Sequence, residues 1–226
     1  IAINSNPISN FGSKVSYSLK NPFTLQNKLK NFFNRQSLKL NIGEKLKKNF
    51  GLTNFKIHRV DHHLSHIASS YYACEFEECL AVSIDGFGDF ASINIAKIDN
   101  GIIKVLDKVV FPNSLGVFYE GITQYLGFPN YGDEYKMMGL AAFGKPKRYE
   151  ELKRTLFQNT HDITKMNLKF FSHQTNSFVY NFVGTPKQSE LLNDNFDKNF
   201  NLKRKKDEAI HQDHKDLAAS AQKLFE

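Results

Sequence analysis

The chain of 226 residues predicts an α/β fold, a mixed sheet with flanking helices. Segments with apolar residues at helical spacing recur along the chain, and apolar or alternating runs typical of strands lie between them. Hydrophobic residues make up 41% of the chain and charged residues 23%, which is typical of a globular domain and excludes a fibre or a disordered tail. The chain can therefore bury one sizeable core.

The first 54 residues have a helical and polar pattern. Thr24 can cap one helix, and Asn41 can cap a second helix that ends at Gly51. The apolar side of the first helix would consist of Leu25, Leu29, Phe32 and Phe33. We expect residues 1–54 to form a peripheral helical segment and residues 55–226 to form the core.

The core is expected to begin with a short strand in residues 55–60. Asp61 can then start a helix. The apolar residues of this helix recur at helical spacing: Leu64, Ile67, Ala68 and Tyr71. The apolar run 80–84 predicts a buried strand, which Asp85 and Gly86 stop because Asp-Gly is a common turn pair.

A β-hairpin is the next predicted element. Residues 90–98 and 102–111 both alternate apolar and polar side chains, as strands do. The linker Asp99-Asn100-Gly101 suits a tight turn, because such a turn requires positive φ angles.

Two further helices are expected in the middle of the chain. Ser114 can cap the first, and Gly127 closes it. Its apolar face would consist of Leu115, Phe118, Ile122, Tyr125 and Leu126. Glycines punctuate residues 131–144, and within them residues 132–139 suggest a loop that shapes a pocket. Pro146 opens the second helix.

The last third of the chain is predicted to hold two strands and a final helix. The strand-like runs are residues 166–171 and 178–183, and a loop-rich polar stretch follows up to Gln212. Residues 214–226 predict an amphipathic helix that stops before a capping residue. Because the chain also starts at Ile1, we expect it to be truncated at both ends.

Charge and cysteine content narrow the class of protein. The net charge is +7, but the lysines are spread through polar stretches, which favours a solvated basic surface over a nucleic-acid interface. The mean hydropathy is −0.44, and no apolar run is long enough for a bilayer. The two cysteines, Cys74 and Cys79, cannot build a disulfide scaffold. We expect a cytoplasmic protein that binds no membrane.

The most informative segment contains three of the eight histidines within five residues. His62 and His66 are one helical turn apart, so their imidazoles can converge on one metal ion, whereas His63 points elsewhere. Asp85, at the end of the predicted strand, would complete a set of two histidines and one carboxylate, which suits Fe(II), Zn(II) or Mn(II). The alternative is a cluster of surface histidines with Asp85 in an ordinary turn.

Three other residues are candidates for contact with a cofactor. Gly86 and Gly88 would let the backbone approach a phosphate closely. Lys136 could hold a phosphate or carbonyl oxygen as a point charge. The alternative for Lys136 is an ion pair with Glu134 or Asp133 at the start of a helix. No catalytic residue is assigned.

Five motifs follow one another along the chain: His62–Ser69, Ser83–Asp89, Phe111–Gly116, Tyr125–Phe128 and Glu134–Ala141. In order and spacing they resemble the O-carbamoyltransferases of the nodulation-factor and antibiotic-tailoring type. The resemblance covers residues 55–147 and, more loosely, residues 216–226.

The resemblance implies part of an actin-like ATPase (Kae1-like) fold and an ATP-dependent transfer reaction. In the family, carbamoyl phosphate and ATP yield carbamoyl-adenylate, and an acceptor hydroxyl takes the carbamoyl group. The family's metal ligands carry over to His62, His66 and Asp85, with Fe²⁺ favoured over Zn²⁺ or Mn²⁺. A further aspartate ligand and the nucleotide-binding half lie later in the family's chain, so we expect the isolated 226 residues to be inactive.

The resemblance also implies partners. The acceptor would be a small molecule with a hydroxyl group, such as a sugar or a secondary metabolite. A second copy of the chain, in a homodimer, is kept as a further possible partner. Two other functions remain as alternatives. One is the tRNA threonylcarbamoyltransferase branch of the same fold, and the other is a basic nucleic-acid-binding module without catalysis, for which the net charge of +7 is the only support.

Overall fold

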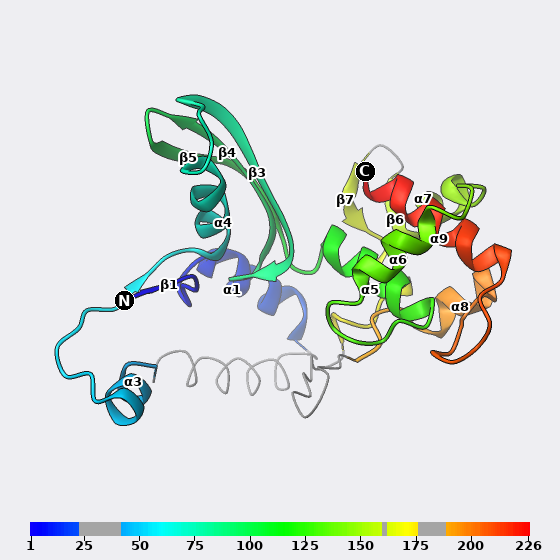
Figure 1. Cartoon of the computed structure of the whole chain (residues 1–226), viewed down its shortest axis with the longest axis horizontal. Helices are drawn as coiled ribbons and strands as arrows, with labels where there is room; N and C mark the ends of the chain where they lie inside the picture. Colours follow the sequence, from blue (N-terminus) through cyan, green and yellow to red (C-terminus); the bar gives the residue numbers. More distant parts are fainter. Residues whose placement is uncertain (23–41, 160–161, 176–188) are drawn as a thin grey trace. The chain divides into compact units, whose positions relative to one another are not determined.

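The computed structural model describes residues 1–22, 42–159, 162–175 and 189–226 (Figure 1). These residues combine helices with several small sheets, so the predicted α/β class is confirmed. The chain divides into two compact units, Ile1–Phe111 and Pro112–Glu226. The predicted actin-like architecture and the division at residue 54 stay predictions.

The first unit contains a three-stranded antiparallel sheet in the order β3-β4-β5, formed by Glu78–Gly88, Ala91–Asp99 and Ile102–Val110. The predicted hairpin between β4 and β5 is confirmed. Asn100 and Gly101 at its tip have φ angles of 46° and 79°, as a two-residue turn with the twist of the strands requires.

The prediction that β3 ends at Asp85 and is buried is wrong. β3 continues to Gly88, although its pairing with β4 shifts register between Ile84 and Gly88. Leu80, Val82 and Ile84 are exposed, because alternate side chains of a strand point to opposite faces and these three lie on the face away from the helix α4. A short apolar run cannot show which faces of its sheet are covered.

The helix α4 covers the other face of this sheet (Figure 1). It spans His62–Tyr71 and starts as predicted, with the Asp61 carboxylate accepting a hydrogen bond of 3.2 Å from the backbone N–H of Leu64. Ile67 packs against Ala96 and Ile98 of β4 in a buried apolar cluster. This packing fixes the helix on the sheet.

The N-terminal part of this unit holds two helices and a small parallel sheet. α1 spans Phe11–Lys20 and α3 spans Ile42–Phe50, as predicted for the helix that ends at Gly51. The strand expected over residues 55–60 is short: β2, His58–Arg59, pairs with β1, Ala2–Ile3. The helix expected after Thr24 lies outside the described residues.

The second unit is a group of helices around α9, Gln212–Phe225, whose predicted position is confirmed. α5, Leu115–Tyr125, starts at Ser114, whose side chain accepts from the N–H of Val117 at 3.1 Å. Gly127 follows it with a φ of 82°, which favours glycine. α7, Tyr149–Leu156, buries Leu152 and Leu156 and begins three residues after Pro146.

Three predictions in this unit are wrong. The loop expected over residues 132–139 is instead largely helical, because α6, Glu134–Ala141, buries Met137 and Leu140. The strand expected at 166–171 is instead a single 3₁₀ turn, Leu168–Phe170, that follows the β6-β7 hairpin, Phe157–Asn159 and Asp162–Met166. The polar stretch before Gln212 contains α8, Asp194–Phe200, which buries Phe196 and Phe200. The strand expected at 178–183 lies outside the described residues.

Each of these errors has a physical cause. The free energy gained when a few apolar side chains are buried against neighbouring elements outweighs the weak intrinsic preference of a segment for helix, strand or loop. A single sequence does not show which elements will be neighbours. No helix within the described residues is both long and apolar enough to cross a bilayer.

A buried carboxylate joins α9 to the segment between α6 and α7. Asp216 pairs with the Lys147 ammonium at 2.7 Å and accepts from the N–H of Lys145 at 2.9 Å. Next to it, a Cβ added to Gly144 would lie 2.0 Å from the Lys215 carbonyl oxygen, so the two segments touch through backbone. The hydrogen bonds from Lys147, Lys145 and Gln212 lower the pKa of Asp216 to about 2.

We expect Asp216→Asn to lower the free energy of unfolding near pH 7 by roughly 1 to 2 kcal/mol, because the variant lacks the paired charge. The pKa of Asp216 is lower in the folded chain than its ordinary value of 3.8. Its contribution is therefore present above about pH 4 and is lost as the pH falls through about 2. Urea unfolding between pH 7 and pH 2 should show the two chains converging at low pH.

The control is Asp213→Asn, which alters an exposed acid in the first turn of the same helix. It should change stability little at any pH. A difference between wild type and Asp216→Asn that persists at pH 2 would contradict the role given to the charge.

Candidate metal centre

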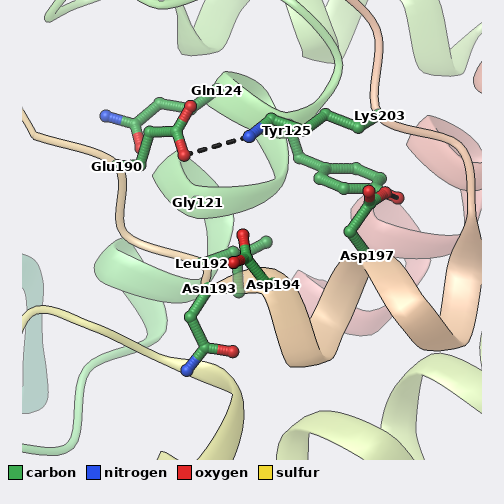
Figure 2. A pocket seen from close by; sticks show the side chains of 9 residues that line it. All are labelled: Gly121, Gln124, Tyr125, Glu190, Leu192, Asn193, Asp194, Asp197 and Lys203. Atoms are coloured by element: carbon green, nitrogen blue, oxygen red, sulfur yellow. Dashed lines mark hydrogen bonds and ion pairs between the residues drawn. The ribbon is translucent and has the colours of Figure 1, made fainter.

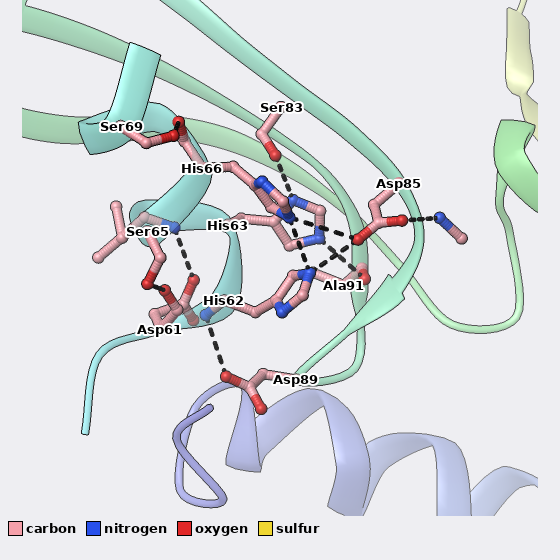
Figure 3. A network of polar contacts seen from close by, with 12 residues as sticks. Asp61, His62, His63, Ser65, His66, Ser69, Ser83, Asp85, Asp89 and Ala91 are labelled. Carbon is pink, nitrogen blue, oxygen red and sulfur yellow. Dashed lines mark hydrogen bonds and ion pairs between the residues drawn. The ribbon is translucent and has the colours of Figure 1, made fainter. Parts of the chain in front are cut away.

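The structure brings the three predicted ligand residues together, as Figure 3 shows. His62 and His66 project from α4, and Asp85 projects from β3 where its pairing with β4 is interrupted. Nε2 of His62 lies 2.7 Å from Oδ2 of Asp85 and 3.0 Å from Nε2 of His66. Nε2 of His66 lies 3.6 Å from the same Asp85 oxygen. The predicted convergence is confirmed, whereas the role of metal ligand stays a prediction.

The donor set fits a divalent cation. Two imidazole nitrogens and one carboxylate oxygen are ligands that Fe(II), Zn(II) and Mn(II) accept. Donor atoms about 2.0 to 2.2 Å from a common ion lie roughly 3 Å apart, which is close to the separations seen here. The two Nε2 atoms face each other and cannot both carry a proton in that contact. If neither carried one, each would offer a lone pair to the same cation.

Electrostatics favour an ionised Asp85. Burial opposes ionisation, but the hydrogen bonds from His62 and from the N–H of Gly86 outweigh it, and the pKa of Asp85 lies below its ordinary value. The His66 side chain is 51% exposed and that of Asp85 40%. One side of the cluster is thus open to solvent.

Gly86 and Gly88 have different roles in the structure. The N–H of Gly86 donates to Oδ1 of Asp85 at 2.6 Å and so orients the carboxylate. A Cβ added to Gly88 would lie 1.9 Å from Cδ2 of His62, so only glycine leaves room for the imidazole. Contact of either glycine with a phosphate stays a prediction.

His63 is a part of the site that the sequence analysis missed. It points away from the ligand pair, as expected, but it is fully buried rather than surface-exposed. Its Nε2 lies 3.0 Å from the Ala91 carbonyl oxygen and its Nδ1 2.8 Å from Oγ of Ser83. Because a carbonyl only accepts, Nε2 carries the proton and Nδ1 accepts from the serine. Burial lowers the pKa of His63, which favours this neutral form.

A signal for His63 was present in the sequence. It lies four residues before Ile67, on the face of α4 that packs against the sheet.

Asp89 was also missed as part of the site, although its carboxylate accepts a hydrogen bond of 3.1 Å from the backbone N–H of His62.

Lys136 belongs to the second unit, at the start of α6. Its ammonium lies 2.6 Å from Oδ1 of Asp133, so the ion pair that we held as the alternative is present. The Asp133 side chain is buried, and its other oxygen accepts from the N–H of Asn130 at 3.1 Å. Binding of a cofactor by Lys136 stays a prediction.

A small hollow in the second unit contains several acidic residues (Figure 2). Several of its polar side chains are paired with one another. The Tyr125 hydroxyl donates to Asp197 at 2.6 Å, and Lys203 pairs with Glu190 at 3.0 Å. Burial and the hydrogen bond to Asp197 raise the pKa of Tyr125.

Comparison with known proteins adds independent information. A family model described as the carbamoyltransferase N-terminus matches residues 14–226. Nodulation protein NolO of Bradyrhizobium diazoefficiens is 43% identical over 95 residues, which are 41% of this chain and 17% of that protein. Nodulation protein NolNO of Sinorhizobium fredii is 41% identical over 97 residues, 43% of this chain and 14% of that protein.

A third relative is an uncharacterized protein of Synechocystis sp., 31% identical over 135 residues, which are 57% of this chain and 22% of the relative. The chain thus spans about a fifth of the length of these curated relatives or less.

The two glycines give a matched test of the centre. We expect Gly88→Ala to displace the His62 imidazole, to destabilise the chain by roughly 1 to 3 kcal/mol through overpacking, and to weaken Zn²⁺ binding. Gly86→Ala should do neither, because no atom lies within 4 Å of the added Cβ. Thermal melting and calorimetric Zn²⁺ titration of both variants check this. Equal behaviour of the two would show that Gly88 does not make room for His62.

Proposed function

Because this chain belongs to the carbamoyltransferase family, we propose that it supplies the metal-binding region of an ATP-dependent O-carbamoyltransferase. The observation that supports the proposal is the convergence of His62, His66 and Asp85 on one point. Family membership gives the class of reaction, and the donor set gives a place where charge on phosphate or carbonyl oxygens can be neutralised.

The proposed reaction joins three substrates. Carbamoyl phosphate is hydrolysed to carbamate and phosphate, and the carbamate attacks the α-phosphorus of ATP to give carbamoyl-adenylate and pyrophosphate. A hydroxyl of a sugar or secondary metabolite then attacks the carbamoyl carbon, loses its proton and releases AMP. A bound divalent cation, for which Fe²⁺ is favoured over Zn²⁺ or Mn²⁺, supplies positive charge near the developing negative charge. We place this reaction in the cytoplasm. Assembly of the protein as a homodimer is kept as an alternative to the monomer.

The chain's own residues prepare the site for this chemistry. His62 and His66 present Nε2 towards Asp85, and the Gly86 N–H holds the ionised carboxylate in orientation. The exposed side of His66 and Asp85 leaves an approach for the substrate. His63 holds the helix that carries both ligand histidines.

Lys136 is proposed to contact a phosphate oxygen of a substrate. Its ammonium has three N–H groups, of which the hydrogen bond to Asp133 takes one. The side chain is 37% exposed, so the other groups can reach a ligand. The same ion pair raises the pKa of Lys136, which keeps the charge that such a contact needs.

Metal titration tests the proposed ligands. We expect His66→Ala to weaken Fe²⁺ or Zn²⁺ binding well beyond the roughly 10-fold to 100-fold that loss of an outer-shell partner costs. The helix should persist, because alanine is the best helix former. His58→Ala is the control, since His58 is an exposed histidine of the same unit outside the cluster. His63→Ala would not serve as the control, because His63 is buried and bonds α4 to the sheet.

Calorimetry and metal content after dialysis give the affinities, and thermal melting shows whether each variant folds. Unchanged affinity in His66→Ala, or an equal loss in His58→Ala, would refute the proposed metal centre.

A transfer assay tests the wider proposal. We expect the 226-residue chain alone to transfer no carbamoyl group from labelled carbamoyl phosphate to a hydroxyl acceptor, because a coupled catalytic set loses most of its rate when a member is missing. A protein with the full length of the relatives should transfer it, and Asp85→Asn in that protein should abolish transfer. Turnover by the chain alone would contradict the expectation.

A further inference from the structure

We propose that Asp89 is a positioning residue of the metal centre, which it serves by holding the first turn of α4 and therefore His62. The inference rests on the proposed function, since it concerns the same centre. Asp89 itself is not part of the group of donor atoms formed by His62, His66 and Asp85.

The Asp89 carboxylate bonds to the start of α4, as Figure 3 shows, and also to the N-terminal segment. Its Oδ2 accepts hydrogen bonds from the backbone N–H of His62 at 3.1 Å and from that of Asn6 at 2.7 Å. Its Oδ1 accepts from the Ser5 hydroxyl at 3.0 Å. Both carboxylate oxygens therefore accept hydrogen bonds from the chain.

This contact matters because the first N–H groups of a helix have no partner within the helix. In α4, Asp61 accepts from the N–H of Leu64, and Asp89 accepts from that of His62. Negative charge at this end of a helix is also favourable, because the helix dipole is positive there. Two carboxylates therefore stabilise one helix start.

The stabilised turn carries one ligand and not the other. His62 is the first residue of α4, whereas His66 lies one turn further in, where the helix packs through Ile67. Fraying of the first turn would displace His62 and leave His66 in place. Loss of Asp89 should consequently remove one metal ligand without unfolding the helix.

The backbone around Asp89 aims its carboxylate at the helix. Asp89 and Phe90 have φ angles of 50° and 77°, a conformation that side chains other than glycine rarely adopt. The Asn10 side-chain amide donates to the Asp89 carbonyl oxygen at 3.0 Å and holds this turn. Its neighbour Gly88 touches the His62 imidazole, so consecutive residues fix the ring and the backbone of one ligand.

The test compares Co²⁺ binding by the 226-residue chain and two variants of Asp89. Asp89→Gly removes the carboxylate and suits a positive φ, so it adds no backbone strain. Asp89→Asn keeps an oxygen for the two N–H groups, and its amide N–H₂ can donate to the Ser5 hydroxyl. Absorption bands of bound Co²⁺ report the number and arrangement of ligands, which a change in stability alone would not alter.

We expect Asp89→Gly to lower Co²⁺ affinity by about 10-fold or more and to change the absorption bands. Asp89→Asn should restore affinity and bands close to those of wild type. Asn100→Gly is the matched control, because it places glycine at another residue with positive φ, in the turn between β4 and β5, where the Asn100 side-chain amide donates to Asp99. It should leave both readouts unchanged.

The outcomes separate this inference from the proposed function. Wild-type chain that binds no Co²⁺ would overturn both. Wild-type binding with the same affinity and bands in Asp89→Gly would overturn the role of Asp89 alone, as would failure of Asp89→Asn to restore them. If thermal melting shows that Asp89→Gly does not fold, Asp89→Ser replaces it, since a serine side chain is too short to reach both N–H groups, and the same expectation applies.

Discussion

The candidate metal centre depends on one constraint, the packing of helix α4 against strands β3 and β4. Ile67 enters the apolar cluster with Ala96 and Ile98, and the neutral His63 imidazole joins Ser83 of β3 to Ala91 of β4. A buried imidazole with both nitrogens bonded costs little in desolvation, whereas an unpaired one would cost much. This contact fixes the register of helix against sheet, and the distance between the ligand histidines and Asp85 follows from it.

The sequence predicted those features that depend on neighbours in the chain. The helix start at Asp61, the cap at Ser114 and the tight turn at Asn100 and Gly101 each follow from local hydrogen bonding or from φ preference, and all three are present. The extent and exposure of β3 could not be predicted in this way, since they depend on which face of the sheet a helix covers. α6 and α8 form because they bury side chains against elements distant in sequence.

In the candidate site too, features that depend on nearby residues in the chain were predicted, and features that depend on distant residues were not. One-turn spacing was enough to pair His62 with His66, and a carboxylate following an apolar run was enough to suggest Asp85. The need for glycine at position 88 could not be predicted, because it arises from contact with an imidazole 26 positions earlier in the chain. Glycine occurs both where a turn must be flexible and where another group approaches the backbone closely, so the sequence does not distinguish the two causes. The structure shows that Gly88 leaves room for the His62 imidazole and that the N–H of Gly86 orients the Asp85 carboxylate.

The contacts of Asp89 with Ser5 and Asn6 also bear on the order in which this unit folds. They join residues 84 and 83 positions apart, whereas β3, β4 and β5 follow one another through short turns. Closing a long loop costs more conformational entropy than closing a short one, so the local meander should form before the N-terminal segment docks. The arrangement of the candidate ligands then becomes complete in a late step of folding, and the same segment would be among the first to detach in a partial opening of the native state.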